Sequence, residues 1–354
     1  MTGPYLVADS NTQSVRYTLG TGPVAELAPP LKQITERQFG DSRAARRALL
    51  RGEIDAIDRV VPWDVAALES ADGITVATYA LPTVHVLIPN PRKPLTASRH
   101  FRRALCYGIH RQAILDEVIL RGRSRPGFVV LSGPFPVGQS IDDPIGAAVD
   151  RRIAPYPYEP RLALILATVA LREMAAAGAA QPAADATPAA KSDSAAGVTP
   201  PLVLAYRAEP LARLACEAIQ AHLEIVDIPV TLKPLTAGDL ADPLGTADLL
   251  YAELAMWEPL VDAQQLLGDG GLAGSTSAYM QLALRQVAEA QNWNELWDAL
   301  RSVHRVAHDE VAVIPLWQTY NDLAYRSTLQ GVGQQPVTLY QNVQRWTNSA
   351  PRGN

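Results

Sequence analysis

The sequence LVLAYRAEPLARLACEAIQAHLEIVDIPVTL occupies residues 202–232 and has the pattern of a strand, a helix and a second strand. Leu202–Tyr206 is a short apolar run, about Pro210–Leu223 has helical spacing, and Val230–Leu232 is apolar again. A further apolar run, Asp248–Glu253, follows. Parallel strands need a crossover connection such as this helix, and their sheet is usually covered on both faces. These residues therefore predict an α/β lobe.

The segments upstream extend this prediction. In the apolar run Val84–Ile88, side chains of alternate residues would point to opposite faces of a sheet. A stripe at every fourth residue, Phe101, Leu105, Ile109 and Ala113, predicts one long helix. The elements expected here are a helix at Ser42–Leu50 closed by Gly52, strands at Ile54–Val61, Ile74–Tyr79 and Val84–Ile88, and a helix at about Ala97–Leu120.

The region downstream predicts two helices, Ser277–Gln291 and Asn294–His308, and an extended tail from Val311 to Trp317. Between the two halves, residues 175–201 consist mostly of Ala, Pro, Gly, Ser and Thr. Such a segment buries too little apolar surface to offset the entropy lost on ordering. We therefore predict a disordered surface insertion at 175–201 within one lobe.

Composition limits the possible functions. The 354 residues suffice for two or three lobes, and 48% apolar with 19% charged residues is typical of a folded protein. The net charge of -5 gives no basic surface for nucleic acid. Two isolated cysteines predict neither a disulfide framework nor a zinc site. No apolar run approaches the roughly 20 residues of a membrane span, and the N-terminus does not resemble a secretory signal.

Several short strings in the same order resemble one family. The matching strings are Thr2-Gly3-Pro4-Tyr5, Ala48–Asp55, Asn90–Pro94, Phe101–Leu105 with Gly108–Arg111, Tyr156–Pro160 with Leu162–Leu166, and Ile314–Trp317. Together they are similar to the extracytoplasmic solute-binding proteins of ABC transporters that take dipeptides, oligopeptides or nickel. In that family the turn resembling Gly3-Pro4-Tyr5 lies well inside the chain. The resemblance therefore implies that an N-terminal portion, somewhat under half of the protein, is missing here.

The resemblance also implies an α/β fold of the type II periplasmic-binding-protein class, with one complete lobe and part of the other. Residues 1–60 would be the remnant of the first lobe and the crossover. Residues 61–310 would form the α/β lobe with the insertion, and residues 311–354 would return to the first lobe. Ligand would lie in a cleft between the lobes, as in other two-lobed clamps.

The family binds its ligand next to a strand that runs into a motif with tryptophan and aspartate, where the aspartate pairs with a peptide ammonium. The corresponding stretch here is Tyr251–Asp262, and Met256 takes the place of that aspartate. Glu253, Glu258 or Asp262 could supply the negative charge, and Trp257 could stack on the ligand. Equally, Trp257 and Met256 could be core residues and the carboxylates solvated. Tyr251 and Trp317 complete the candidate set, with Gln318 and Tyr320 as weaker candidates for the cleft lining.

Catalytic motifs are absent from the sequence. It contains no GxSxG, GxxxxGK[ST], GxGxxG or HExxH string. His304 and His308 share a helix face, but they lie beside the core stripe of Val303 and Ala307, which favours a structural role. We therefore predict no catalytic residue, no metal ligand and no cofactor.

The resemblance implies a monomeric solute-binding component, periplasmic or anchored at the cell surface as a lipoprotein. It would bind a peptide or peptide-like ligand and deliver it to a membrane permease, without contacting nucleic acid. Two alternatives remain open, a ligand-sensing domain of a transcriptional regulator and a remnant of the fold that binds nothing. A hydrolase built on the same fold would require a nucleophile and a base in the cleft. The length and identity of the ligand are left open.

Overall fold

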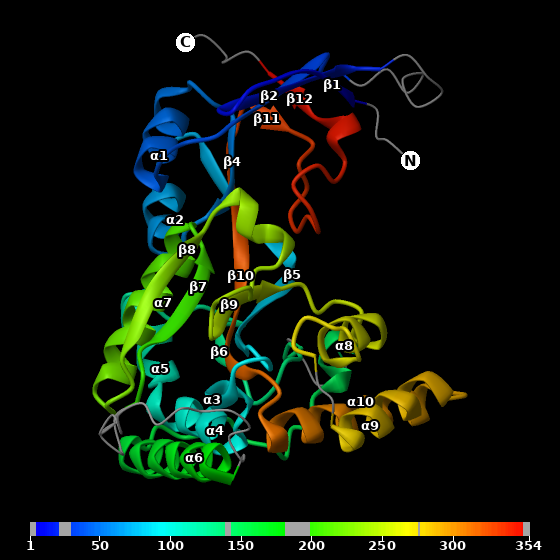
Figure 1. The fold of residues 1–354 in the computed structure, drawn as a ribbon. Coiled ribbons are helices and arrows are strands. Elements are labelled where there is room, and N and C mark those ends of the chain that lie inside the picture. The colour runs from blue at the N-terminus through cyan, green and yellow to red at the C-terminus, as the bar shows by residue number, and fades with distance from the viewer. Residues whose placement is uncertain (1–4, 21–29, 139–142, 181–198, 275–276, 350–354) are drawn as a thin grey trace. The chain divides into compact units, whose positions relative to one another are not determined.

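A computed structural model describes residues 5–20, 30–138, 143–180, 199–274 and 277–349 (Figure 1). The chain forms two compact units. Unit 1 comprises Met1–Leu81 and Tyr320–Asn354, and unit 2 comprises Pro82–Thr319. The chain passes between them inside two long strands, β5 (Ile74–Pro89) and β10 (Ile314–Arg326). The division into lobes at residues 60 and 310 stays a prediction.

Unit 2 is built on a mixed sheet. The strand β7 (Leu202–Arg207) pairs in parallel with β8 (Val230–Leu235) on one side and with β9 (Leu249–Leu254) on the other. The strand β9 is antiparallel to β5, and the short β6 (Val129–Val130) pairs with β10. The predicted β-α-β unit and the α/β fold class are confirmed.

The crossover helix α7 (Pro210–Glu224) forms where the apolar spacing predicts it. Pro210 occupies the first turn, where the missing N–H has no helical partner to lose. Gln220, near the end of α7, links the helix to the next strand: its Nε2 donates a hydrogen bond to the carbonyl of Val230 at 2.7 Å. The buried stripe of α7 consists of Ala212, Ala215, Cys216, Ile219 and Leu223.

The single helix predicted at 97–120 is wrong, because the chain breaks it twice. Ser98 has an extended backbone and caps the next helix, and Ile109 is extended as well. The predicted stripe residues Phe101, Leu105 and Ile109 are nevertheless buried. The segment consists of α3 (Pro94–Ala97), α4 (Arg99–Gly108), α5 (Arg111–Ala113) and a π-helix, η2 (Ile114–Ile119).

The insertion predicted at 175–201 starts too early, because α6 (Pro160–Ala180) continues through residue 180. Residues 181–198 lie outside the described part of the chain. The later helices of unit 2 are α8 (Pro259–Leu267), α9 (Ala278–Glu289) and α10 (Trp293–Glu310). They contribute to a core cluster of unit 2, to which the stripe residues Leu300, Val303 and Ala307 of α10 belong. Two short 3-10 helices, η3 (Pro144–Ala148) and η4 (Ala237–Ala241), lie in loops of unit 2.

Unit 1 contains a three-stranded antiparallel sheet of β1 (Tyr5–Ser10), β2 (Ser14–Leu19) and β3 (Gln33–Arg37). The helix α1 (Ser42–Arg51) ends at Gly52, whose φ of 76° is the left-handed conformation expected of a closing glycine. The remaining elements are β4 (Ala56–Val60), α2 (Pro62–Glu69), β11 (Leu329–Gln330), η5 (Val343–Arg345) and β12 (Thr347–Asn348).

Two further differences concern strands. The predicted strands at 74–79 and 84–88 are one strand, β5, that continues through Pro82. The tail is extended as predicted but begins at Ile314, because Val311 closes α10 in the left-handed conformation. None of the helices in the described part of the chain combines the length and hydrophobicity needed to span a bilayer.

Candidate ligand-binding site

The topology of unit 2 points to one edge of its sheet. From β7 the chain leaves through α7 towards β8, whereas from the neighbouring β9 it leaves through α8 and returns as β10 on the far side of β5 (Figure 1). Ligands of open α/β sheets bind outside the carboxyl ends of the strands at such a reversal. The residues that follow β7 and β9 are therefore the candidate site of this unit.

Trp257 lies at this point, after the end of β9. Its ring is 37% exposed, and its Nε1–H donates to the carbonyl oxygen of Pro82 at 2.9 Å. The bond fixes one edge of the indole and leaves ring surface open to solvent. Met256, by contrast, is 3% exposed and belongs to the core cluster of unit 2. The sequence left open whether Met256 and Trp257 are core residues. Met256 is in the core, and Trp257 is partly exposed.

The two carboxylates nearest to Trp257 in sequence surround the start of α8. Glu258 is exposed, and its backbone N–H donates to the carboxylate of Asp262 at 2.7 Å. Asp262 therefore binds the backbone N–H of the N-cap residue from within the first turn of α8, where a negative charge is also favoured by the helix dipole. The Glu258 side chain forms no hydrogen bond or ion pair among the described residues. Glu258 is thus better placed than Asp262 to receive a cationic group.

Tyr251 and Trp317 lie in the interior instead. Tyr251 is 2% exposed and Trp317 is fully buried, and their rings flank the imidazole of His85 at centroid distances of 5.8 and 6.1 Å. The Tyr251 hydroxyl lies 2.7 Å from His85 Nδ1, and Thr319 Oγ1 lies 2.8 Å from Nε2. Glu253 is half-buried and pairs with His85 in the ladder of β5 and β9.

This interior network carries no charge near neutral pH. Burial lowers the pKa of His85 to about 3. Burial also raises the pKa of the Tyr251 phenol well above its ordinary value, and the negative charges of Glu253 and Glu209 raise it further. A neutral imidazole has one donor and one acceptor, so one hydroxyl donates to His85 and the other accepts from it. The network therefore joins three strands, β5, β9 and β10, without an ion pair.

The six candidate residues thus fall into two groups. Trp257, Glu258 and Asp262 lie at the start of α8, whereas Tyr251 and Trp317 lie together around His85, with Glu253 on the same strand as Tyr251. The weaker candidates are buried as well: Gln318 binds the backbone of Val137 and Gly127, and Tyr320 is 5% exposed. The role of all these residues in binding stays a prediction.

Sequence reasoning assigned no role to His85 or Glu209. Glu209 lies two residues after the end of β7, at the N-cap of α7, where its side chain forms no capping hydrogen bond, and it is close enough to raise the pKa of Tyr251. A carboxylate between a parallel strand and the next helix was the signal that could have identified it. His85 gives no such signal, because its partners Tyr251 and Thr319 are far away in sequence.

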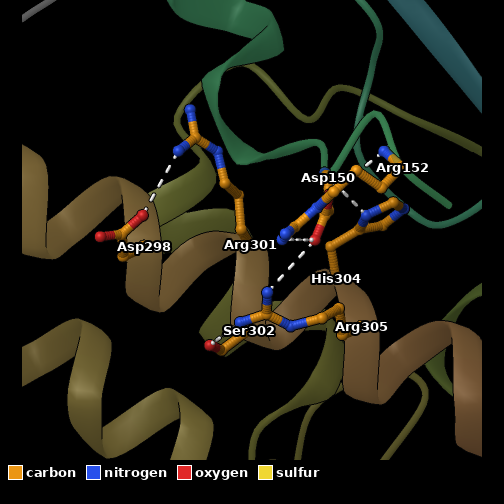
Figure 2. A network of polar contacts seen from close by, with 7 residues as sticks. All are labelled: Asp150, Arg152, Asp298, Arg301, Ser302, His304 and Arg305. Carbon is orange, nitrogen blue, oxygen red and sulfur yellow. Dashed lines mark hydrogen bonds and ion pairs between the residues drawn. The ribbon is translucent and has the colours of Figure 1, made fainter.

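Figure 2 shows a second polar network, around Asp150, which bears on the enzyme alternative. The Asp150 carboxylate is held by Arg152 at 2.8 Å and by Arg305 at 3.2 Å. His304 is buried, and its Nε2 lies 3.2 Å from Ser132 Oγ, the spacing of a serine–histidine pair. However, the backbone N–H of Asp150 donates to His304 Nδ1 at 3.0 Å. The proton of the neutral ring is therefore on Nε2, so the ring donates to Ser132 and does not act as its base.

His308 takes a structural role too, with Nδ1 2.8 Å from the carbonyl of Ser132 and its ring stacked on Tyr156. Both histidines contact protein groups, as the core stripe predicted. Among the described residues, no three His, Cys, Asp or Glu side chains form a cluster that could hold a metal ion.

The α/β sheet with its reversal between β7 and β9 defines a protein of the periplasmic-binding-protein class. Residues 1–259 match the family of bacterial extracellular solute-binding proteins, family 5 Middle. The chain belongs to this family. A comparison with curated proteins finds no match.

Solved structures show the same fold. The periplasmic binding protein DppA of Helicobacter pylori, in complex with the peptide STSA, has a TM-score of 0.77 at 17% identity, over 98% of this chain and 63% of that chain. The oligopeptide-binding protein AppA of Bacillus subtilis, in complex with a nonapeptide, has a TM-score of 0.77 at 15% identity, over 98% and 66%. NikA of Staphylococcus aureus, in complex with Ni(L-His)2, has a TM-score of 0.73 at 15% identity, over 98% and 68%. The chain thus spans about two thirds of the length of these structures.

Proposed function

We propose that this chain acts as the solute-binding component of an ABC transporter and that its ligand is a peptide or a peptide-like molecule. The observation that carries the proposal is the partly exposed indole of Trp257, held at the carboxyl ends of β7 and β9 beside the exposed Glu258. Family membership supports the transport role. Outside the cell or in the periplasm, the protein would work as a monomer and deliver its ligand to a membrane permease.

The chemistry of the site suits a peptide better than an uncharged solute. An indole face stacks on a planar peptide group or on an apolar side chain, and it attracts a cation. A carboxylate beside it forms a strong, charge-assisted bond with an ammonium group. Because Met256 contributes no charge, Glu258 and Glu253 are the acidic residues that we assign to this role. Tyr251 and Trp317 would support the site from the interior.

A titration tests the proposal. Pools of tri- to pentapeptides are added to the purified protein while tryptophan emission and the melting temperature are recorded. We expect quenching and a higher melting temperature, and we expect the quenching to be lost in Trp257→Phe. Trp297→Phe is the matched control, because Trp297 is 36% exposed and lies on α10, outside the set of candidate residues. A folded wild-type protein that responds to no pool would contradict peptide binding.

A second arm uses nickel(II) with histidine, the ligand bound in the similar NikA structure. A response to this complex alone would assign the chain to metal transport and would overturn the peptide proposal. If the response to peptides survives in Trp257→Phe but is lost in Glu258→Gln, the ligand is still a peptide, and the Glu258 carboxylate rather than the indole is the group that binds it.

A further inference from the structure

Trp257 contacts β5 at a special position. Pro82, whose carbonyl accepts the indole N–H, is the first residue of unit 2 on this strand. The backbone ladder between β5 and β9 ends with the pair of Val84 and Leu254. Beyond that pair β9 turns into α8, so the Trp257 side chain attaches β5 two residues further than the ladder does. The bond from the Trp257 indole thus attaches β5 to unit 2 up to Pro82, the residue at the unit boundary.

The other strand that crosses between the units is held in the same way. Thr319 is the last residue of unit 2 on β10, and its hydroxyl lies 2.8 Å from His85 Nε2. His85 is itself fixed by Tyr251 of β9. Side chains anchored to β9 therefore hold both crossing strands at the boundary residue, Pro82 through Trp257 and Thr319 through Tyr251 and His85. Each anchor is a side-chain contact, so a substitution can remove it without cutting the ladder.

We propose that Trp257 is a positioning residue that holds β5 in place where the chain leaves unit 2, so that a ligand on the exposed ring acts directly on a crossing strand. This role of Trp257 in holding β5 rests on its bond to Pro82 and does not require a ligand. The action of a ligand rests on the proposed function.

Hydrogen exchange followed by mass spectrometry tests the hold on β5 without a ligand. Trp257→Phe keeps an aromatic ring but removes the N–H donor together with part of the ring, and Trp297→Phe makes the same change in size. We expect exchange in the peptide covering Thr83–His85 to rise roughly two- to tenfold, the factor for the net loss of one hydrogen bond. Peptides from β7 and β8 should be unchanged, and Trp297→Phe, an equal replacement elsewhere on the surface of unit 2, should leave Thr83–His85 unchanged.

Two results would overturn the inference. The first is unchanged exchange at Thr83–His85 in Trp257→Phe. The second is an equal rise in β7 and β8, which would show general loosening of unit 2. The peptide titration tests the proposed ligand independently of this experiment. If Trp257→Phe speeds local exchange but the wild type responds to no peptide, the role of Trp257 in holding β5 stands and the peptide ligand is rejected. If the wild type responds to peptides but exchange is unchanged in Trp257→Phe, the peptide ligand stands and the role in holding β5 is rejected.

Discussion

The buried imidazole of His304 predicts an acid-sensitive stability. Burial, together with the neighbouring charges of His308 and Arg305, lowers the pKa of His304 to about 4, while Asp150 acts in the opposite direction. In the unfolded chain the pKa is about 6.5. The unfolded form therefore takes up a proton first as the pH falls. The stabilisation is complete above about pH 6.5 and is lost progressively down to about pH 4.

The magnitude follows from the size of the shift. A difference of about 2.5 pH units at roughly 1.4 kcal/mol per unit gives a loss on the order of 3 kcal/mol of the free energy of unfolding. Protonation of Nδ1 would also place two donors, this nitrogen and the backbone N–H of Asp150, opposite each other. Turning the ring over does not remove this conflict, because both nitrogens of a protonated imidazole are donors.

The assay is urea unfolding of the wild type and of His304→Asn at several pH values from about 7.5 to 4.5. The asparagine oxygen can still accept from the Asp150 N–H but does not titrate. We expect His304→Asn to be less stable at pH 7.5 by about 1–3 kcal/mol, since it leaves a gap and loses the Ser132 contact. The difference should shrink as the pH falls, by about 2 kcal/mol. If the free energies of unfolding of the two proteins change with pH in parallel, the reasoning is refuted. Other titrating groups, such as His85, are present in both proteins and therefore cancel in the difference.

Three further predictions concern single contacts. Tyr251→Phe should lower the free energy of unfolding by about 1–3 kcal/mol, because it leaves a nitrogen of the buried His85 without its partner; urea unfolding measures it, and an unchanged midpoint would be inconsistent with a buried bond. Gly331→Ala should destabilise unit 1 by at least about 2 kcal/mol, since a Cβ there would collide with the backbone oxygen of Arg345. Gly52→Ala should cost only about 1 kcal/mol, because the group that its Cβ would meet is the movable end of the Arg326 side chain; equal melting temperatures of the two variants would contradict this. Arg111→Met should lower the melting temperature more than Arg111→Lys, because the buried guanidinium donates to the carbonyls of Pro315 and Tyr156; the reverse order would argue against the two bonds.

The local elements of unit 2 could be predicted because they follow from short-range patterns. The strand and helix at 202–224 appear almost unchanged, since apolar spacing and Pro210 act within a few residues. The apolar stripe from Phe101 to Ile109 correctly predicted which side chains are buried, but it wrongly predicted one continuous helix. The residues that break the helix, Ser98 and Ile109, fit a helical pattern in sequence but have extended backbones, and the helix between them, α4, packs against α6. Contacts of that kind come from a distant part of the chain.

The candidate site shows the same division. Strand alternation does not reveal whether one or both faces of a strand are covered, and in β5 every residue from Val84 to Pro89 is buried. Tyr251 and Trp317 therefore looked like candidates for a cleft although both lie inside. The order of strands, with β9 between β5 and β7, decides this, and it depends on the pairing of β5 with β9, in which Val84 lies opposite Leu254, far away in the chain. Trp257 was identified correctly as a residue at the end of a strand, but its bond to Pro82 has no sequence signal.

The position of Met256 adds a physical reason for assigning the charge to its neighbours. With this backbone, the side chain at 256 points into a cluster of apolar residues that includes Ala263 and Leu266. An aspartate there would lose its hydration without gaining a partner, at a cost of several kcal/mol. A binding carboxylate at the end of β9 must therefore come from a residue on the open side. Glu258 is such a residue, and Trp257 next to it offers the aromatic surface, which is why the proposal rests on this pair.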